Sequence, residues 1–209
     1  MKCGRPLIVT DGHLLGSGLP TRLQSQRITS GMQCKIFAGV VADPTTDAVD
    51  QGVHAVLTGR YDSLVSLGDE SSIDTAKSIG MLGANGGCVS DYKVPNPIPQ
   101  AGPPHIAIST TAGTGSEVTR FTVISDSGSK EKMLIAGAAL LPSAAIVDYE
   151  LTMSMPRRLT ADTGTDSLTH AIEAYVSRKA NSFTDMFAME IRSARPVDQM
   201  LPLSCAVAK

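Results

Sequence analysis

Residues 106–117 read IAISTTAGTGSE, an apolar run that ends in hydroxyl side chains and two glycines. Ile106 and Ile108 alternate with smaller residues, as in a β-strand. Gly113 and Gly115 permit backbone angles that are closed to other residues, so the strand is predicted to end in a turn. A turn with this many N–H and O–H donors can bind a phosphate group, although a surface turn between two elements has the same composition.

Apolar runs and helical patterns alternate over the first 150 residues or so. The predicted strands are 6–10, 35–40, 63–67, 106–109 and 144–147, the predicted helices are 19–30, 45–58 and 75–82, and 121–125 with 132–135 are predicted to form a hairpin. Strands that alternate with helices are typical of a parallel sheet covered on both faces. The sequence therefore predicts an α/β fold.

A helical pattern begins after Pro156 and carries two residues with metal-binding side chains. Asp166 and His170 are four residues apart, so they project from the same side of a helix. A carboxylate and an imidazole placed in this way can bind one divalent metal ion. They can equally form an exposed ion pair that contributes little, and the spacing leaves both interpretations open.

Composition excludes several classes of function. The 209 residues carry a formal net charge of −2, which gives no field suited to nucleic acid or to an anionic membrane. No apolar run approaches the length of a membrane span, and the N-terminus lacks the hydrophobic region of a signal peptide. The four cysteines are far apart, which favours thiols in a reducing cytosol, so we expect a cytoplasmic protein.

Several stretches together resemble the iron-containing (group III) alcohol dehydrogenase family, which includes lactaldehyde, butanol, methanol and propanediol dehydrogenases. The stretches are 73–77 (IDTAK), 110–117 (TTAGTGSE), 146–148 (IVD) and 166–175 (DSLTHAIEAY). The resemblance runs in order from about Leu7 to about Met189. It implies an enzyme that interconverts a small alcohol and its aldehyde or ketone by hydride transfer to and from NAD at a metal ion, usually Fe²⁺ and sometimes Zn²⁺.

The resemblance also implies a division of the chain. Residues 1–155 would form an α/β parallel-sheet dinucleotide-binding domain. Residues 156–209 would form the start of an all-helical metal-binding domain, with a divergent tail that replaces most of the helices of the family. The substrate would lie in the cleft between the two domains, and a homodimer is one assembly that the resemblance allows.

Carried over residue by residue, the resemblance implies cofactor-binding positions at strand ends and turns. These positions are Asp11, Gly68, Ser71, Asp74, Thr110, Thr111, Thr114 and Lys132. Asp166 and His170 would be the first two metal ligands. Asp11 would hold a ribose hydroxyl and repel a 2′-phosphate, so we expect NAD to bind in preference to NADP.

The turn after the third strand departs from the family pattern. Gly68-Asp69-Glu70-Ser71 stands where the family has three glycines and a serine. Each carboxylate would repel a pyrophosphate by about 1 kcal/mol at close range in water, so we expect weak cofactor binding. Asp69 and Glu70 would also be good first residues of a helix that binds no phosphate, and this alternative stays open.

The metal ligands are a second departure. The family supplies two further histidines from a later helical region, and no histidine follows His170 in this sequence. Since metal sites generally need three or four protein ligands, we expect little or no iron and little alcohol oxidation in the isolated chain. The alternative to an active enzyme is a truncated remnant that serves as a nucleotide-binding or dimerisation module.

Overall fold

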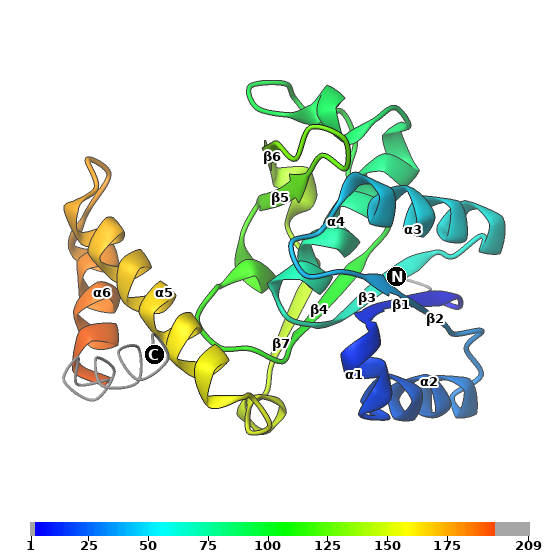
Figure 1. The fold of residues 1–209 in the computed structure, drawn as a ribbon, viewed down its shortest axis with the longest axis horizontal. Helices are drawn as coiled ribbons and strands as arrows, with labels where there is room; N and C mark the ends of the chain where they lie inside the picture. Colours follow the sequence, from blue (N-terminus) through cyan, green and yellow to red (C-terminus); the bar gives the residue numbers. More distant parts are fainter. Residues whose placement is uncertain (1–2, 195–209) are drawn as a thin grey trace. The chain divides into compact units, whose positions relative to one another are not determined.

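A computed structural model describes residues 3–194, and its elements follow the predicted alternation of strands and helices (Figure 1). Among these residues the chain divides into two units. The first comprises residues 3–110 and 115–148, and the second comprises residues 111–114 and 149–194. Most of the tail predicted to be divergent lies outside the described residues.

The first unit is built on a parallel sheet with the strand order β2-β1-β3-β4-β7. The strands are β1 (Pro6–Asp11), β2 (Lys35–Val40), β3 (Ser63–Gly68), β4 (His105–Ser109) and β7 (Ala144–Val147). Gly68 pairs with Ser109 and Asp11 with Val40, so the carboxyl ends of these strands meet at one edge. The predicted α/β fold with a parallel sheet is confirmed.

Helices cover both faces of this sheet. Figure 1 shows α1 (Gly12–Gly16) and α2 (Leu19–Thr29) on one face and α3 (Thr46–Gly59) and α4 (Glu70–Asn85) on the other. The side chains of Asp11, Thr45 and Asp69 cap α1, α3 and α4 by accepting a backbone N–H three residues on. Helix α1 was not predicted, because its glycines give no helical pattern. In the structure the Asp11 cap stabilises the start of this helix.

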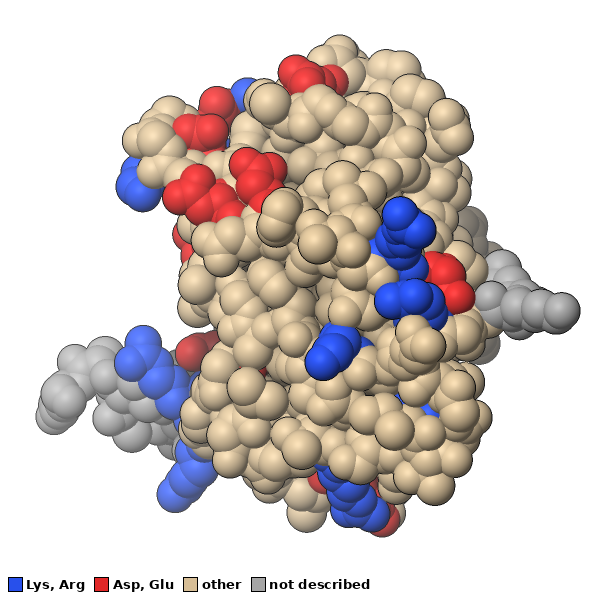
Figure 2. Space-filling model, turned by 90° about the vertical axis from the view of Figure 1, so that its right-hand side faces the viewer, with Lys and Arg blue, Asp and Glu red and all other residues tan. Residues whose placement is uncertain are grey.

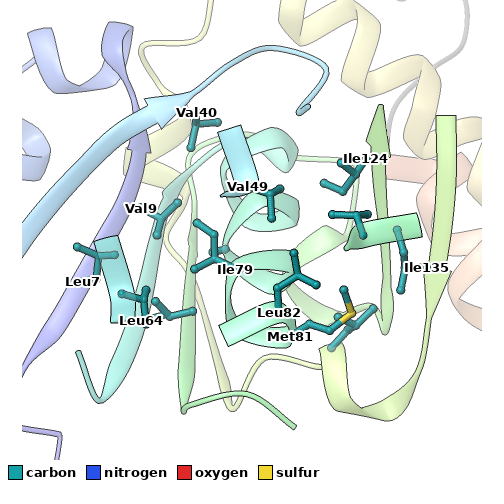
Figure 3. Packing of buried hydrophobic residues seen from close by; sticks show 14 of the residues in the cluster. Leu7, Val9, Val40, Val49, Leu64, Ile79, Met81, Leu82, Ile124 and Ile135 are labelled. Atoms are coloured by element: carbon teal, nitrogen blue, oxygen red, sulfur yellow. The ribbon is translucent and has the colours of Figure 1, made fainter. Parts of the chain in front are cut away.

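The core of the first unit lies between the sheet and the helices α3 and α4 (Figure 3). The antiparallel hairpin of β5 (Phe121–Ser125) and β6 (Lys132–Ala136) packs against α4 and adds Ile124 and Ile135 to this core. Each buried aliphatic side chain stabilises the fold by about 1.5–3 kcal/mol. This packing fixes α4, whose N-terminus follows Gly68 directly.

The second unit contains α5 (Arg157–Val176) and α6 (Ser182–Ala194), which pack against each other. The helical pattern after Pro156 is thus divided, and Asn181 starts α6 by accepting the N–H groups of Phe183 and Thr184. The short 3-10 helices of the chain are η1 (Val89–Tyr92), η2 (Ser116–Val118), η3 (Ala138–Leu140) and η4 (Tyr149–Thr152). Of the helices in residues 3–194, none has the length and apolar character to span a membrane.

One face of the molecule is shown in Figure 2, where Lys and Arg side chains stand in small groups separated by neutral surface. Proteins that bind a nucleic acid backbone present a continuous basic patch or stripe. On the face that Figure 2 shows, the basic side chains of the described residues form no such continuous stripe.

Candidate cofactor and metal site

The turns that follow β3 and β4 lie side by side. The backbone N–H of Thr110 donates to the carbonyl oxygen of Gly68 over 2.9 Å. The Asp11 carboxylate lies 3.7 Å from the position that a Cβ at Gly68 would take. Three of the predicted cofactor positions, Asp11, Gly68 and Thr110, therefore gather at the carboxyl edge of the sheet, where parallel α/β folds bind nucleotides.

The N-terminus of α4 is the expected place for the pyrophosphate, and a carboxylate of the chain already holds it. The Asp69 Oδ1 atom accepts the backbone N–H of Ser72 at 3.1 Å and its hydroxyl at 3.3 Å. Ser71, predicted to bind the cofactor, is half-buried in the same turn. Because the N–H groups of a helix N-terminus are what a phosphate would bind, Asp69 occupies a donor that a dinucleotide at this turn would need.

Asp74, also predicted to bind the cofactor, lies in the interior of the first unit with 4% of its surface exposed. Its Oδ1 atom accepts the Ser116 hydroxyl at 2.7 Å, and its Oδ2 atom accepts the Val123 N–H at 2.9 Å. The Lys77 ammonium lies 3.6 Å from Oδ1 and donates to the Phe121 carbonyl oxygen at 2.7 Å. The pair therefore ties α4 to η2 and β5.

Burial has opposite effects on the two members of this pair. It raises the pKa of Asp74 and lowers the pKa of Lys77, while the attraction between the two charges opposes both shifts. Sequence reasoning did not identify the buried role of Lys77. The usable signal was its position three residues after an acid on a helix, since residues at this spacing are neighbours on the helix surface.

His105, at the start of β4, is a second buried titratable group. One of its ring nitrogens, Nε2, lies 2.8 Å from the Ser66 hydroxyl oxygen. Burial, and to a smaller degree the positive charge of Lys77, lower the pKa of His105 to about 3. The imidazole is therefore neutral at physiological pH.

Lys132, predicted to bind the cofactor, begins β6 and forms an ion pair with Asp43. Its Nζ atom lies 3.1 Å from Asp43 Oδ1, which also accepts the Ser125 hydroxyl. The hydrogen bond from Lys132 is the main cause of the lowered pKa of Asp43. Both side chains are largely exposed, so the pair contributes little and the ammonium can exchange Asp43 for another anion.

Thr111 and Thr114 belong to the second unit, unlike Thr110. The segment 111–114 contacts α5: a Cβ at Gly113 would lie 2.3 Å from the Thr163 carbonyl oxygen. The predicted threonine loop is therefore a continuous stretch of chain whose residues belong to both units. The sequence did not indicate that this loop would be divided.

Asp166 and His170 lie one turn apart on α5, as predicted. The Oδ1 atom of Asp166 is 3.8 Å from Nε2 of His170, and the two side chains are 42% and 50% exposed. A carboxylate oxygen and an imidazole nitrogen suit Fe²⁺ or Zn²⁺. Within residues 3–194, no group of three or more His, Cys, Asp or Glu side chains is arranged to hold a metal ion.

Comparison with known proteins gives a consistent result. Residues 1–149 match the family model described as iron-containing alcohol dehydrogenase, and residues 160–207 match the C-terminal model of the same family. An NAD-dependent methanol dehydrogenase from Bacillus methanolicus is 42% identical over 202 residues, 97% of this chain and 52% of that protein. Alcohol dehydrogenase 4 from Schizosaccharomyces pombe is 40% identical, over 88% of this chain and 44% of that protein.

Solved structures agree with these sequence matches. A 1,3-propanediol oxidoreductase superposes with a TM-score of 0.82 at 37% identity, over 90% of this chain and 49% of that one. A sulfoacetaldehyde reductase from Bifidobacterium kashiwanohense, in complex with NAD⁺, gives a TM-score of 0.82 at 31% identity, over 89% and 49% of the two chains. The chain spans about half the length of the curated relatives it matches.

Proposed function

The chain belongs to the iron-containing alcohol dehydrogenase family. On this premise we propose that it functions as an NAD- and iron-dependent alcohol dehydrogenase. The substrate would be a small alcohol, interconverted with its aldehyde or ketone. The observation that carries the proposal is the gathering of Asp11, Gly68 and Thr110 at the carboxyl edge of the sheet.

The residues of this edge would hold the dinucleotide. In our proposal Asp11 accepts a hydrogen bond from a ribose hydroxyl. The pyrophosphate binds at the turn of Gly68 and Ser71 after it displaces the Asp69 carboxylate from the Ser72 N–H. Thr110, Thr111, Thr114 and Lys132 would supply further donors, while Asp74 would act by holding the end of the loop at Ser116. The nicotinamide of the bound cofactor supplies the hydride acceptor.

We propose that residues 1–155 bind the dinucleotide and that residues 156–209 begin the helical metal-binding domain. Asp166 and His170 would supply two ligands to iron from one side of α5. When bound, iron supplies a Lewis acid that polarises the oxygen of the substrate. Because two ligands hold a metal ion weakly, we expect low iron affinity unless further ligands complete the site.

Metal content tests the proposal. The chain, the double variant Asp166→Ala/His170→Ala and the matched control Asp162→Ala/Glu173→Ala would be purified with added Fe²⁺. The control removes two acidic residues from the same helix but leaves the proposed ligands in place. We expect the chain and the control to retain more iron than the double variant.

Cofactor binding and turnover complete the test. NAD would be titrated into each protein, and NADH formation would be followed with a panel of short primary alcohols. NAD binding together with iron that depends on Asp166 and His170 supports the dehydrogenase. NAD binding with equal, negligible iron in all three proteins and no NADH formed would instead identify an inactive nucleotide-binding remnant.

A further inference from the structure

Gly113 makes an unusually close contact with α5 inside the second unit. A Cβ at this residue would lie 2.3 Å from the Thr163 carbonyl oxygen and 2.5 Å from the Ser167 Oγ atom. Its φ angle is +130°, which residues with side chains rarely adopt. Only glycine allows the segment 111–114 to lie this close to the turn between Thr163 and Ser167.

This turn of α5 leads directly into the proposed metal ligands. The Ser167 hydroxyl donates to the Thr163 carbonyl oxygen at 3.1 Å, and Thr163 is 7% exposed. Asp166 lies within the turn, and His170 follows one turn later. A side chain at position 113 would displace the turn from which Asp166 projects.

The chain on both sides of this segment is anchored in the first unit. Thr110 donates its N–H to Gly68 in the proposed cofactor turn, and Ser116 donates its hydroxyl to Asp74 at 2.7 Å. Because the chain is continuous from Thr110 to Ser116, the segment that contacts α5 is flanked on both sides by residues held in the first unit.

We propose that Gly113 is a positioning residue that seats the segment 111–114 on α5 and so couples the cofactor turn to the Asp166–His170 pair. The inference rests on the proposed function for its two ligands, a dinucleotide and a divalent metal ion. Linkage requires the coupling to be reciprocal: NAD raises the affinity for the metal ion by the same factor by which the metal ion raises the affinity for NAD.

Backbone hydrogen exchange tests the seating without any ligand. Gly113→Ala is compared with Gly115→Ala, a matched control in the same loop whose φ is also positive, at +68°, but whose added Cβ would meet nothing within 4 Å. We expect amides 163–170 to exchange about tenfold faster in Gly113→Ala and at an unchanged rate in Gly115→Ala, since only the first variant disturbs the contact. Unchanged exchange in strands β1 and β3 would show that each variant is folded.

The coupling is measured separately, as the effect of NAD on the Zn²⁺ affinity. If Gly113 had only a structural role, Gly113→Ala would leave this effect of NAD unchanged. The Zn²⁺ affinity is determined against a chelating dye with and without saturating NAD. We expect NAD to lower the Zn²⁺ dissociation constant about fivefold or more in the chain and in Gly115→Ala, and to leave it unchanged in Gly113→Ala.

Two results would overturn the inference. One is an equal acceleration of exchange on α5 in both glycine variants, and the other is a Zn²⁺ affinity that NAD does not alter although both ligands bind. If the chain binds neither NAD nor Zn²⁺, the proposed function and the coupling both fail, and hydrogen exchange still decides whether Gly113 seats the segment on α5.

Discussion

The ammonium of Lys77 lies 3.6 Å from the carboxylate of Asp74 in the interior of the first unit, where neither residue exposes more than 4% of its surface. The pair joins helix α4, which begins at the proposed pyrophosphate site, to Ser116 at the end of the threonine loop. One pair of buried charges therefore holds the helix that follows the Gly68 turn and the end of the threonine loop at Ser116, although the two are distant in the sequence.

Lys77→Met is predicted to destabilise the chain strongly. It leaves Asp74 buried without its cation, which costs about 3–5 kcal/mol in the free energy of unfolding. Asp74→Asn combined with Lys77→Met removes both charges and should recover part of this loss. Urea denaturation measures the free energy of unfolding of both variants. The control is Lys93→Met, which breaks the exposed pair with Glu131. A loss of stability in Lys77→Met no larger than that of the control would contradict the prediction.

Replacing Asp69 and Glu70 with glycine is predicted to strengthen NAD binding. Removal of one charge at close range is worth about 1 kcal/mol in water, or roughly fivefold in the dissociation constant. Asp69→Asn separates two causes, because asparagine keeps the cap on Ser72 but removes the charge. If occupation of the helix N-terminus matters more than charge, Asp69→Gly will bind NAD more tightly than Asp69→Asn. An unchanged affinity in all variants would show that no phosphate binds at α4.

Asp11 is predicted to favour NAD over NADP. In Asp11→Asn the helix cap on Leu14 can be kept, since asparagine also caps well, while the repulsion of a 2′-phosphate is lost. The ratio of the NADP and NAD dissociation constants should therefore fall by roughly fivefold. Parallel titrations with both cofactors measure this ratio, and tighter binding of NADP by the unaltered chain would refute the assignment.

His105 is predicted to make the fold sensitive to acid. Its folded-state pKa of about 3 lies below the ordinary value of 6.5, so between these values only the unfolded chain takes up the proton. The free energy of unfolding should therefore fall by about 1.4 kcal/mol for each pH unit below 6.5, as far as pH 3. Above pH 6.5 His105 contributes no pH dependence.

The measurement is the urea midpoint between pH 7 and pH 4 for the chain and for His105→Gln. Glutamine can still bond to the Ser66 hydroxyl but cannot titrate, so the variant should lose less stability on acidification. Parallel pH profiles for the two proteins would show that His105 is not the responsible group.

Apart from α1, the strands and main helices of the first unit could be predicted, because each buried strand is a short apolar run next to a turn. The nearness of the turns at Gly68 and Thr110 followed from the same pattern, since parallel strands end at one edge. The acid three residues before Lys77 marked a possible pair, but the burial of Lys77 depends on how α4 packs against η2 and β5, which the sequence of the helix does not record. The pairing of Lys132 with Asp43 depends on how the hairpin packs, which no local pattern records.

The Asp69 cap has a consequence for how ligands of this chain can be found. A helix N-terminus left open would gain its hydrogen bonds only when a phosphate arrives, and the melting temperature would rise accordingly. Here the Ser72 N–H is satisfied before any ligand is added, so a phosphate exchanges one acceptor for another. At the same concentration, a nucleotide should therefore raise the melting temperature of this chain less than that of Asp69→Gly, whose helix N-terminus is open.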